Sequence, residues 1–141
     1  MDKGRGLFLC NRNSARSQMA EGLLKHMAGD RFGAYSAGVE PSAVQPLAVK
    51  AMQELGIDIS GHRSKRLSEY MGKVHFSHLI PVCSEAERKC PTTFPGMGHR
   101  LFWHIADPVG FSGSEEEQFA RFRSARDDLA ARLTQWLSTQ P

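Results

Sequence analysis

The sequence predicts an α/β fold in a single domain over residues 1–141, with a four-stranded parallel sheet flanked by helices on both faces. Three observations lead to this prediction. The length of 141 residues is typical of one domain. Short apolar segments alternate with segments of helical period, which is the pattern of βαβ units. No internal repeat, low-complexity tract or linker divides the chain.

The first part of the chain contains two expected strands around an expected helix. Residues 6–10 (GLFLC) form a short apolar run typical of a buried strand, and residues 32–37 (FGAYSA) form a second one. Between them, apolar residues recur at helical spacing from Ser17 onward until Gly29 closes the segment. These apolar residues are Met19, Ala20, Leu23, Leu24 and Met27.

Pro46 opens the next expected helix, because proline is favoured at the first helical position. Gly56 stands where a glycine commonly ends a helix. The apolar face between them consists of Ala48, Ala51, Met52 and Leu55. A weaker helical pattern covers about residues 68–74.

The second half of the chain supplies the remaining elements. Residues 79–82 predict a third strand, although Pro81 lacks an N–H donor and therefore favours an edge strand or a bulge. Residues 101–105 (LFWHI) predict a fourth strand. The most periodic segment, residues 114–137, predicts a long helix whose first turn carries three glutamates, where the helix dipole favours negative charge. Its apolar stripe is Phe119, Phe122, Ala125, Leu129, Leu133 and Trp136.

The composition excludes several classes of protein. Hydrophobic residues make up 40% and charged residues 23%, which indicates a globular chain rather than a disordered one. No apolar run approaches the roughly 18 residues of a membrane span, and the first residues lack the apolar core of a secretory signal. The net charge of +3 is spread along the chain, so nucleic-acid binding is not indicated. We therefore expect a cytoplasmic monomer that binds neither membranes nor nucleic acid.

The three cysteines, Cys10, Cys83 and Cys90, are too few for a disulfide scaffold and odd in number. In a chain without an export signal, this favours thiol chemistry or metal binding over structural bridges. Cys10 ends the first expected strand, and ligands of parallel α/β folds bind beyond the carboxyl ends of the strands. The fold and the cysteine count therefore indicate the same place for a site.

The segment that begins at Cys10 has a Cys-x5-Arg spacing and leads from a strand into a helix. Several backbone N–H groups can then face one concavity, which suits a tetrahedral oxyanion, and Arg16 can clamp two of its oxygens. Asn13 tolerates the left-handed conformation of a tight loop, and hydroxyls of Ser14 or Ser17 can donate to a thiolate at Cys10. The expected oxyanion-binding residues are Asn11, Arg12, Asn13, Ser14, Ala15, Arg16 and Ser17. The loop alone is equally consistent with a purely structural role, in which Cys10 is a small buried residue that ends a strand and Arg16 is a surface side chain.

Two further features lie beyond the third expected strand. Asp107 precedes Pro108, which holds it extended; it is either a general acid that protonates a leaving oxygen or part of an ordinary turn. Cys83 and Cys90 flank six residues rich in helix formers. In a helix their Cα atoms lie about 10.5 Å apart, whereas a disulfide needs roughly 4.4–6.8 Å, so a bridge requires the segment to unwind. The alternatives are two unrelated buried cysteines, or a zinc site whose spacings fit no usual pattern.

Nearly the whole chain carries a family resemblance, through CNRNSARSQMAEGLL, YSAGVEPSAVQPLAVKAMQELGIDISGHRS, VCSEAERKCP and DP. These segments resemble the low-molecular-weight protein tyrosine phosphatases and, within that family, the thioredoxin-coupled arsenate reductases. The second segment is the most diagnostic for the reductase branch.

The resemblance implies an arsenate reductase that serves arsenical resistance and detoxification. In this interpretation Cys10 attacks arsenate held by Arg16 and the loop amides, and Asp107 helps hydroxide to leave. Cys83 then attacks the Cys10–arsenic adduct, arsenite departs, and a Cys10–Cys83 disulfide remains. Cys90 attacks Cys83, and the resulting redox-active disulfide is reduced by thioredoxin, with glutaredoxin as the open alternative. Because thiols supply the electrons, no cofactor and no metal are expected.

The resemblance also implies residues that support the loop, beginning with Ser17. Some reductases of the family bind potassium beside the loop, at positions that match Asn13, Glu21, Ser36 and an Asp where this sequence has Lys65. The ammonium group of Lys65 can occupy the place of the cation. We therefore expect activity that does not depend on potassium.

Two other functions remain open at this point. A phosphatase of the same fold needs Cys10, Arg16 and Asp107 but has no use for Cys83 and Cys90. Weak phosphatase activity is expected in either case, because arsenate and phosphate share shape and charge. A non-catalytic thiol module that binds arsenite or a soft metal would need all three thiols to meet.

Overall fold

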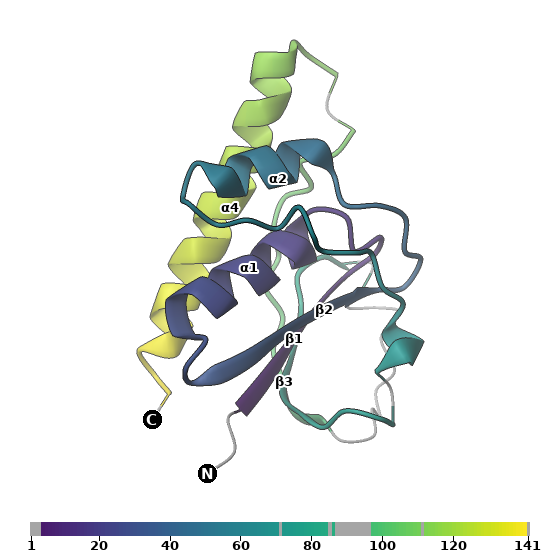
Figure 1. Cartoon of the computed structure of the whole chain (residues 1–141), viewed down its shortest axis with the longest axis vertical. Helices are drawn as coiled ribbons and strands as arrows, with labels where there is room; N and C mark the ends of the chain where they lie inside the picture. Colours follow the sequence, from purple (N-terminus) through teal and green to yellow (C-terminus); the bar gives the residue numbers. More distant parts are fainter. Residues whose placement is uncertain (1–3, 71, 85, 87–96, 111, 141) are drawn as a thin grey trace.

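The computed structural model describes residues 4–70, 72–84, 86, 97–110 and 112–140 (Figure 1). In chain order, the elements are β1 (Gly4–Cys10), α1 (Arg16–Ala28), β2 (Phe32–Gly38), α2 (Pro46–Gln53), the 3₁₀ helix η1 (Leu67–Glu69), β3 (Phe76–Pro81), β4 (Met97–Arg100) and α4 (Glu115–Leu137). The strands form one four-stranded sheet in the order β2-β1-β3-β4, and every neighbouring pair is parallel. The predicted four-stranded parallel sheet is therefore confirmed.

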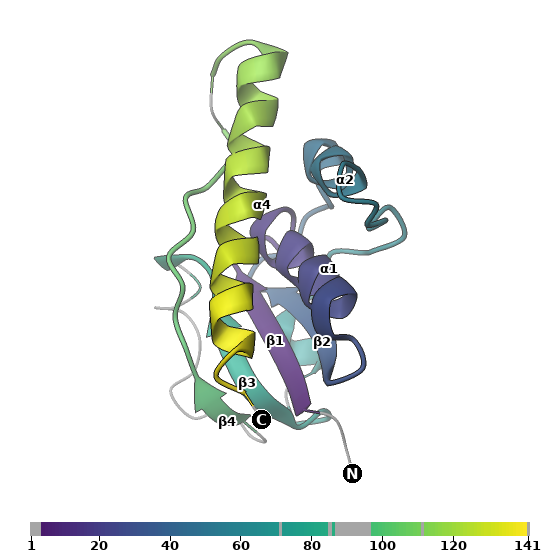
Figure 2. The same ribbon diagram turned by 90° about the vertical axis from the view of Figure 1, so that its left-hand side faces the viewer.

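Helices α1 and α4 cover one face of this sheet. The hydroxyl of Ser36 on β2 donates to Glu21 of α1, and Trp136 of α4 packs edge-on against His78 of β3. Figure 2 shows α1 and α4 side by side against the strands, and α2 packs on these two helices. Side chains alternate along a strand, so Tyr35 points to the opposite face, where its ring meets that of Tyr70 just after η1.

The central strand β1 lies in the middle of the core. Leu7, Phe8 and Leu9 are fully buried, as expected for a parallel strand that is covered on both faces. The predicted stripe of α4 is buried along its whole length. Ser114 caps this helix and forms a capping box with Glu117, which satisfies two backbone donors of the first turn.

The end of α2 confirms the predicted role of Gly56. This glycine has a φ of 74°, and its N–H donates to the carbonyl of Gln53, while the N–H of Ile57 reaches the carbonyl of Met52. These two bonds are the Schellman pattern, which needs a left-handed residue at its centre.

The prediction of a helix over residues 68–74 is wrong. Among the described residues of this segment, 68–70 and 72–74, the structure has only the end of the 3₁₀ helix η1, turns and a bend. Gly72 has a φ of 76°, which an α-helix does not accommodate. A weak helical pattern was here outweighed by a glycine that turns the chain.

The expectations for Pro81 and for the fourth strand also need correction. β3 is an interior strand, with Pro81 as its last residue. The expected strand 101–105 runs beside it, and Leu101 and Trp103 donate to the carbonyls of Leu79 and Pro81. In a regular parallel ladder the N–H of residue 81 would donate in return, and proline lacks it. β4 therefore ends at Arg100.

Candidate active site

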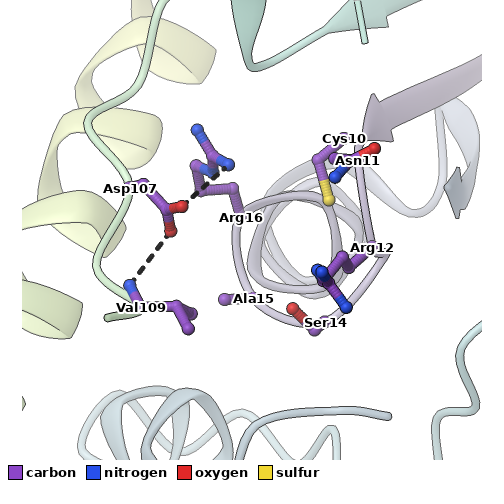
Figure 3. A pocket seen from close by; sticks show the side chains of 8 residues that line it. All are labelled: Cys10, Asn11, Arg12, Ser14, Ala15, Arg16, Asp107 and Val109. Atoms are coloured by element: carbon purple, nitrogen blue, oxygen red, sulfur yellow. Dashed lines mark hydrogen bonds and ion pairs between the residues drawn. The ribbon is translucent and has the colours of Figure 1, made fainter. Parts of the chain in front are cut away.

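A pocket opens at the carboxyl end of β1 (Figure 3). It is lined by Cys10, Asn11, Arg12, Ser14, Ala15, Arg16, Asp107 and Val109. The first six run from the last residue of β1 through the following loop to the first residue of α1, and the last two belong to the segment that follows β4. The fold therefore joins the predicted anion-binding loop to the predicted general acid in one concavity.

The carbonyl groups of the loop point away from this pocket. Those of Cys10, Asn11, Arg12 and Ser14 accept hydrogen bonds from the N–H groups of Val39, Glu40, Ser42 and Gln45, at 3.3, 2.8, 3.2 and 2.8 Å, respectively. Since the C=O and N–H of a trans peptide point in opposite directions, the loop N–H groups face the pocket. In addition, α1 begins without a side-chain cap, which leaves its first N–H groups available to an anion.

Asn13 provides the tight turn of the loop, as predicted. It is fully buried and has a φ of 50°, the one non-glycine residue with a positive φ in the described part of the chain. The backbone N–H of Lys65 donates to its side-chain oxygen at 2.8 Å, and the amide of Gln18 donates to the same oxygen at 2.9 Å. These bonds hold Asn13 in a conformation that is otherwise unfavourable for a residue with a Cβ.

Cys10 lies at the base of the pocket and is 3% exposed. Its sulfur lies 2.8 Å from the hydroxyl of Ser17 and accepts a hydrogen bond from the N–H of Asn13 at 3.2 Å. Of the two serines considered from the sequence, Ser17 is the one that contacts the sulfur, whereas Ser14 lines the pocket. The N–H of Asn13 and the hydroxyl of Ser17 are therefore the polar groups that contact the sulfur at the base of the pocket.

Arg16 and Asp107 form an ion pair across the pocket, with 3.5 Å between their nearest nitrogen and oxygen. Arg16 also donates to the carbonyl of Ile105 at 3.0 Å. The second carboxylate oxygen of Asp107 accepts from the N–H of Val109 at 3.0 Å. Asp107 is therefore fixed at the rim of the pocket, with half of its side chain exposed.

The other predicted support residues meet beneath the loop. Glu21 accepts from Ser36 at 2.6 Å and lies 3.7 Å from the ammonium of Lys65, which donates to the carbonyl of Arg63 at 2.9 Å. Burial lowers the pKa of Lys65, and the charge of Glu21 partly opposes that shift. The ammonium group of Lys65 thus lies beside the carboxylate of Glu21, one of the positions that the resemblance implies for the cation.

Cys83 lies at the end of the strand next to β1. It follows Val82, whose N–H donates to the carbonyl of Leu9 at 2.8 Å, and it is 3% exposed. The N–H of Ala86 donates to its sulfur at 3.3 Å. Cys90 and most of the Cys83–Cys90 segment lie outside the described residues, so the expected helical spacing is not tested.

Three residues of this region were missed in the sequence. Gln18 is fully buried behind the loop, and His62 contacts it. The backbone of Gly38 lies directly against the loop, because a Cβ there would be 2.8 Å from the nitrogen of Asn13. Gln18 lies on the side of α1 opposite its apolar stripe, beside Glu21 and Gly22, so the helical pattern in the sequence gives no signal for it.

The described residues contain no group of three or more His, Cys, Asp or Glu side chains arranged to hold a metal ion. Within the same part of the chain, no helix is long and apolar enough to cross a membrane.

Comparison with known proteins shows similarity over nearly the whole chain. Residues 5–140 match the model of the low molecular weight phosphotyrosine protein phosphatase family. An arsenate reductase of Bacillus subtilis (strain 168) is 42% identical over 133 residues, which is 94% of both chains. An arsenate reductase of Bacillus licheniformis is 42% identical over 140 residues, which is 99% of both chains.

Solved structures with similar folds include reductases and phosphatases. An arsenate reductase in an oxidized state superimposes with a TM-score of 0.80 at 30% identity, covering 95% of this chain and 96% of the other. A low molecular weight protein tyrosine phosphatase from T. tengcongensis has a TM-score of 0.78 at 23% identity, covering 96% and 99%. The second similarity concerns the fold alone.

Proposed function

The chain belongs to the low molecular weight phosphotyrosine protein phosphatase family and is an arsenate reductase within it, and we propose that it acts through a relay of three cysteines with thioredoxin as the electron donor. The observation that carries this proposal is the pair of buried thiols at the ends of two neighbouring strands. Cys10 lies inside the anion-binding pocket, and Cys83 lies at the end of the adjacent strand β3. A phosphatase has a use for the first thiol alone.

In the first step, the thiolate of Cys10 attacks the arsenic atom of arsenate. The loop N–H groups and Arg16 hold the oxygens, and Asp107 gives a proton to the leaving hydroxide, which departs as water. A bond between sulfur and arsenic(V) has formed, and one arsenic–oxygen bond has broken. No electrons have yet been transferred to arsenic.

Reduction takes place in the second step. The thiolate of Cys83 attacks the sulfur of Cys10, a disulfide forms, and the sulfur–arsenic bond breaks with its electron pair remaining on arsenic. Arsenite, in which arsenic is trivalent, then leaves. The two electrons that arsenic gains are those that the two thiols lose.

Cys90 completes the cycle in this proposal. Its thiolate attacks the sulfur of Cys83, which releases Cys10 as a thiolate and leaves a Cys83–Cys90 disulfide. The dithiol of thioredoxin reduces this disulfide by the same exchange chemistry. Such a cycle fits a cytoplasmic monomer that works beside a thiol-reducing system.

Turnover of arsenate with thioredoxin, thioredoxin reductase and NADPH tests the relay. We expect steady NADPH oxidation by the wild type, and no reaction by Cys10→Ser. Cys83→Ser abolishes release of arsenite, while Cys90→Ser allows a single reduction per molecule and no repeated turnover. Continued turnover by Cys90→Ser would contradict the relay. Wild-type turnover that glutaredoxin supports and thioredoxin does not would contradict thioredoxin as the electron donor.

The same pocket supports weak phosphatase activity as a second function. Phosphate esters present the same tetrahedral anion to the loop, and Cys10, Arg16 and Asp107 are the residues that this reaction needs. Hydrolysis of p-nitrophenyl phosphate should be lost in Cys10→Ser and retained in Cys83→Ser. Loss of hydrolysis in both variants would contradict this second function.

A further inference from the structure

The side-chain amide of Gln18 is buried behind the loop, and the proposed relay does not use it. Its nitrogen lies 3.1 Å from the carbonyl oxygen of Asn13, 2.9 Å from the side-chain oxygen of Asn13 and 3.0 Å from the carbonyl oxygen of Arg63. Carbonyl oxygens only accept hydrogen bonds, and the side-chain oxygen of Asn13 also faces the N–H of Lys65. The neighbours of Gln18 therefore determine its orientation: the NH₂ group points at Asn13.

This orientation passes along the loop to the sulfur of Cys10. Because the oxygen of Asn13 is occupied by two donors, its NH₂ group faces Ser17 and donates to the hydroxyl oxygen at 2.7 Å. That bond occupies one lone pair of Ser17, whose own proton can then donate to the sulfur 2.8 Å away. Each group donates to the next one, and the chain of bonds ends at the thiolate.

The other end of the chain lies at His62. The side-chain oxygen of Gln18 is 3.0 Å from Nδ1 of His62. Since this oxygen is an acceptor, the proton of the imidazole must be on Nδ1. The carboxylate of Glu21, 3.5 Å from the same nitrogen, favours that placement. An Nδ1–H group therefore starts the chain, and every member has its donor directed toward Cys10.

We infer that Gln18 is a positioning residue for the Cys10 thiolate, and that it acts by fixing Asn13 so that Ser17 donates to the sulfur. This inference rests on the proposed function, in which Cys10 attacks as a thiolate. Polarised hydrogen bonds in a buried chain strengthen one another, so loss of the Gln18 link weakens the bond at the sulfur. Among the described residues, the charged groups that line the pocket with Cys10 are Arg12, Arg16 and Asp107, and the change leaves them in place.

The test measures how the rate of Cys10 alkylation by iodoacetamide depends on pH. The reaction is monitored through the absorbance of the thiolate at 240 nm, which alkylation removes. The Cys83→Ser/Cys90→Ser double variant is used as the background, so that Cys10 is the one thiol that reacts. Because iodoacetamide is uncharged, its rate of reaction does not depend on attraction to the charged groups of the pocket. Gln18→Met keeps the length of the side chain and removes its polar group. We expect its titration midpoint to move to higher pH and alkylation at neutral pH to slow by about threefold to tenfold, the effect of one net hydrogen bond.

Two further variants separate positioning from general destabilisation. Leu24→Ala removes buried volume from the same helix, so it should lower the melting temperature without moving the Cys10 titration. His62→Phe removes the donor at the other end of the hydrogen-bond chain. It should move the titration midpoint of Cys10 in the same direction as Gln18→Met but by a smaller amount, and it replaces Gln18→Met as the test if that variant does not fold.

The outcomes distinguish this inference from the proposed function. Folded Gln18→Met and His62→Phe proteins whose Cys10 titrates as in the wild type would overturn the inference alone. A shift of the same size in Leu24→Ala would also overturn it. A wild-type Cys10 no more reactive than a free cysteine would contradict the proposed function itself.

Discussion

Replacing Gly38 by alanine places a methyl group against the backbone of the anion-binding loop. That methyl would lie 2.8 Å from the nitrogen of Asn13 and 2.9 Å from both the carbonyl carbon of Arg12 and the oxygen of Asn11. Ordinary contacts begin at 3.4 Å, so the loop must recede by about 0.6 Å. All three contacts are with backbone atoms, which cannot rotate away as a side chain does. The displaced residue, Asn13, carries an N–H that donates to Cys10.

The magnitude follows from the required geometry. A misplacement of about 1 Å costs on the order of a hundredfold in rate, so we expect kcat/KM for arsenate to fall by about tenfold or more in Gly38→Ala. Overpacking of this kind also lowers the free energy of unfolding by about 1–3 kcal/mol. Steady-state kinetics at several arsenate concentrations and thermal unfolding measure the two effects.

Gly61→Ala is the matched control. A Cβ at Gly61 has no atom within 4 Å, so the same substitution there should leave kcat/KM and the melting temperature close to those of the wild type. The reasoning would be refuted by a folded Gly38→Ala protein whose kcat/KM for arsenate equals that of the wild type.

Three further predictions concern other parts of the molecule. Asp107→Asn keeps the size of the side chain and removes the proposed acid; we expect kcat for arsenate reduction to fall by about 10²–10⁴-fold, and an unchanged rate in stopped-flow measurements would exclude that role. Exchange of sodium for potassium at constant ionic strength should leave activity unchanged, because the ammonium of Lys65 already lies beside Glu21; a several-fold rise would be evidence against this. Hydrogen bonds from Arg123 and then Arg126 lower the pKa of Glu54 from 4.5 to about 2. The ionised carboxylate therefore stabilises the fold above pH 4.5, and this contribution is lost as the pH falls toward 2. Glu54→Gln should lower the melting temperature at pH 7 and converge with the wild type in acid, whereas a constant difference at every pH would disprove the assignment.

Periodicity and turn chemistry predicted most of the fold, because those signals are local. The helix that begins at Pro46 and ends with the left-handed Gly56 follows from two residues whose backbone preferences are strong. The strand around Pro81 was misjudged, since its position inside the sheet depends on the neighbours that the fold supplies. A single sequence does not reveal that proline ends an interior strand where one ladder bond is missing.

The candidate site divides in the same way. Cys10, Arg16 and the left-handed Asn13 lie in one short segment, from the end of β1 to the start of α1, and their spacing in the sequence predicts the chemistry. Gln18 and Gly38 instead support the loop from outside it. Gln18 contacts it through a buried side-chain amide, and Gly38 through its backbone, which has no Cβ to hold the loop away. Gln18 is only five residues from Asn13, but its contacts with His62 and Arg63, like that of Gly38 with the loop, join segments that are distant in the chain. Such contacts leave no periodic pattern in the sequence.

The most direct test of the relay is to trap its first disulfide. Cys90→Ser protein, fully reduced and freed of reductant, is mixed with one equivalent of arsenate, and its peptides are analysed by mass spectrometry. The account predicts a disulfide between Cys10 and Cys83 and the release of one arsenite per molecule. Arsenite released while Cys83 remains a free thiol, or no arsenite at all from the folded protein, would contradict it.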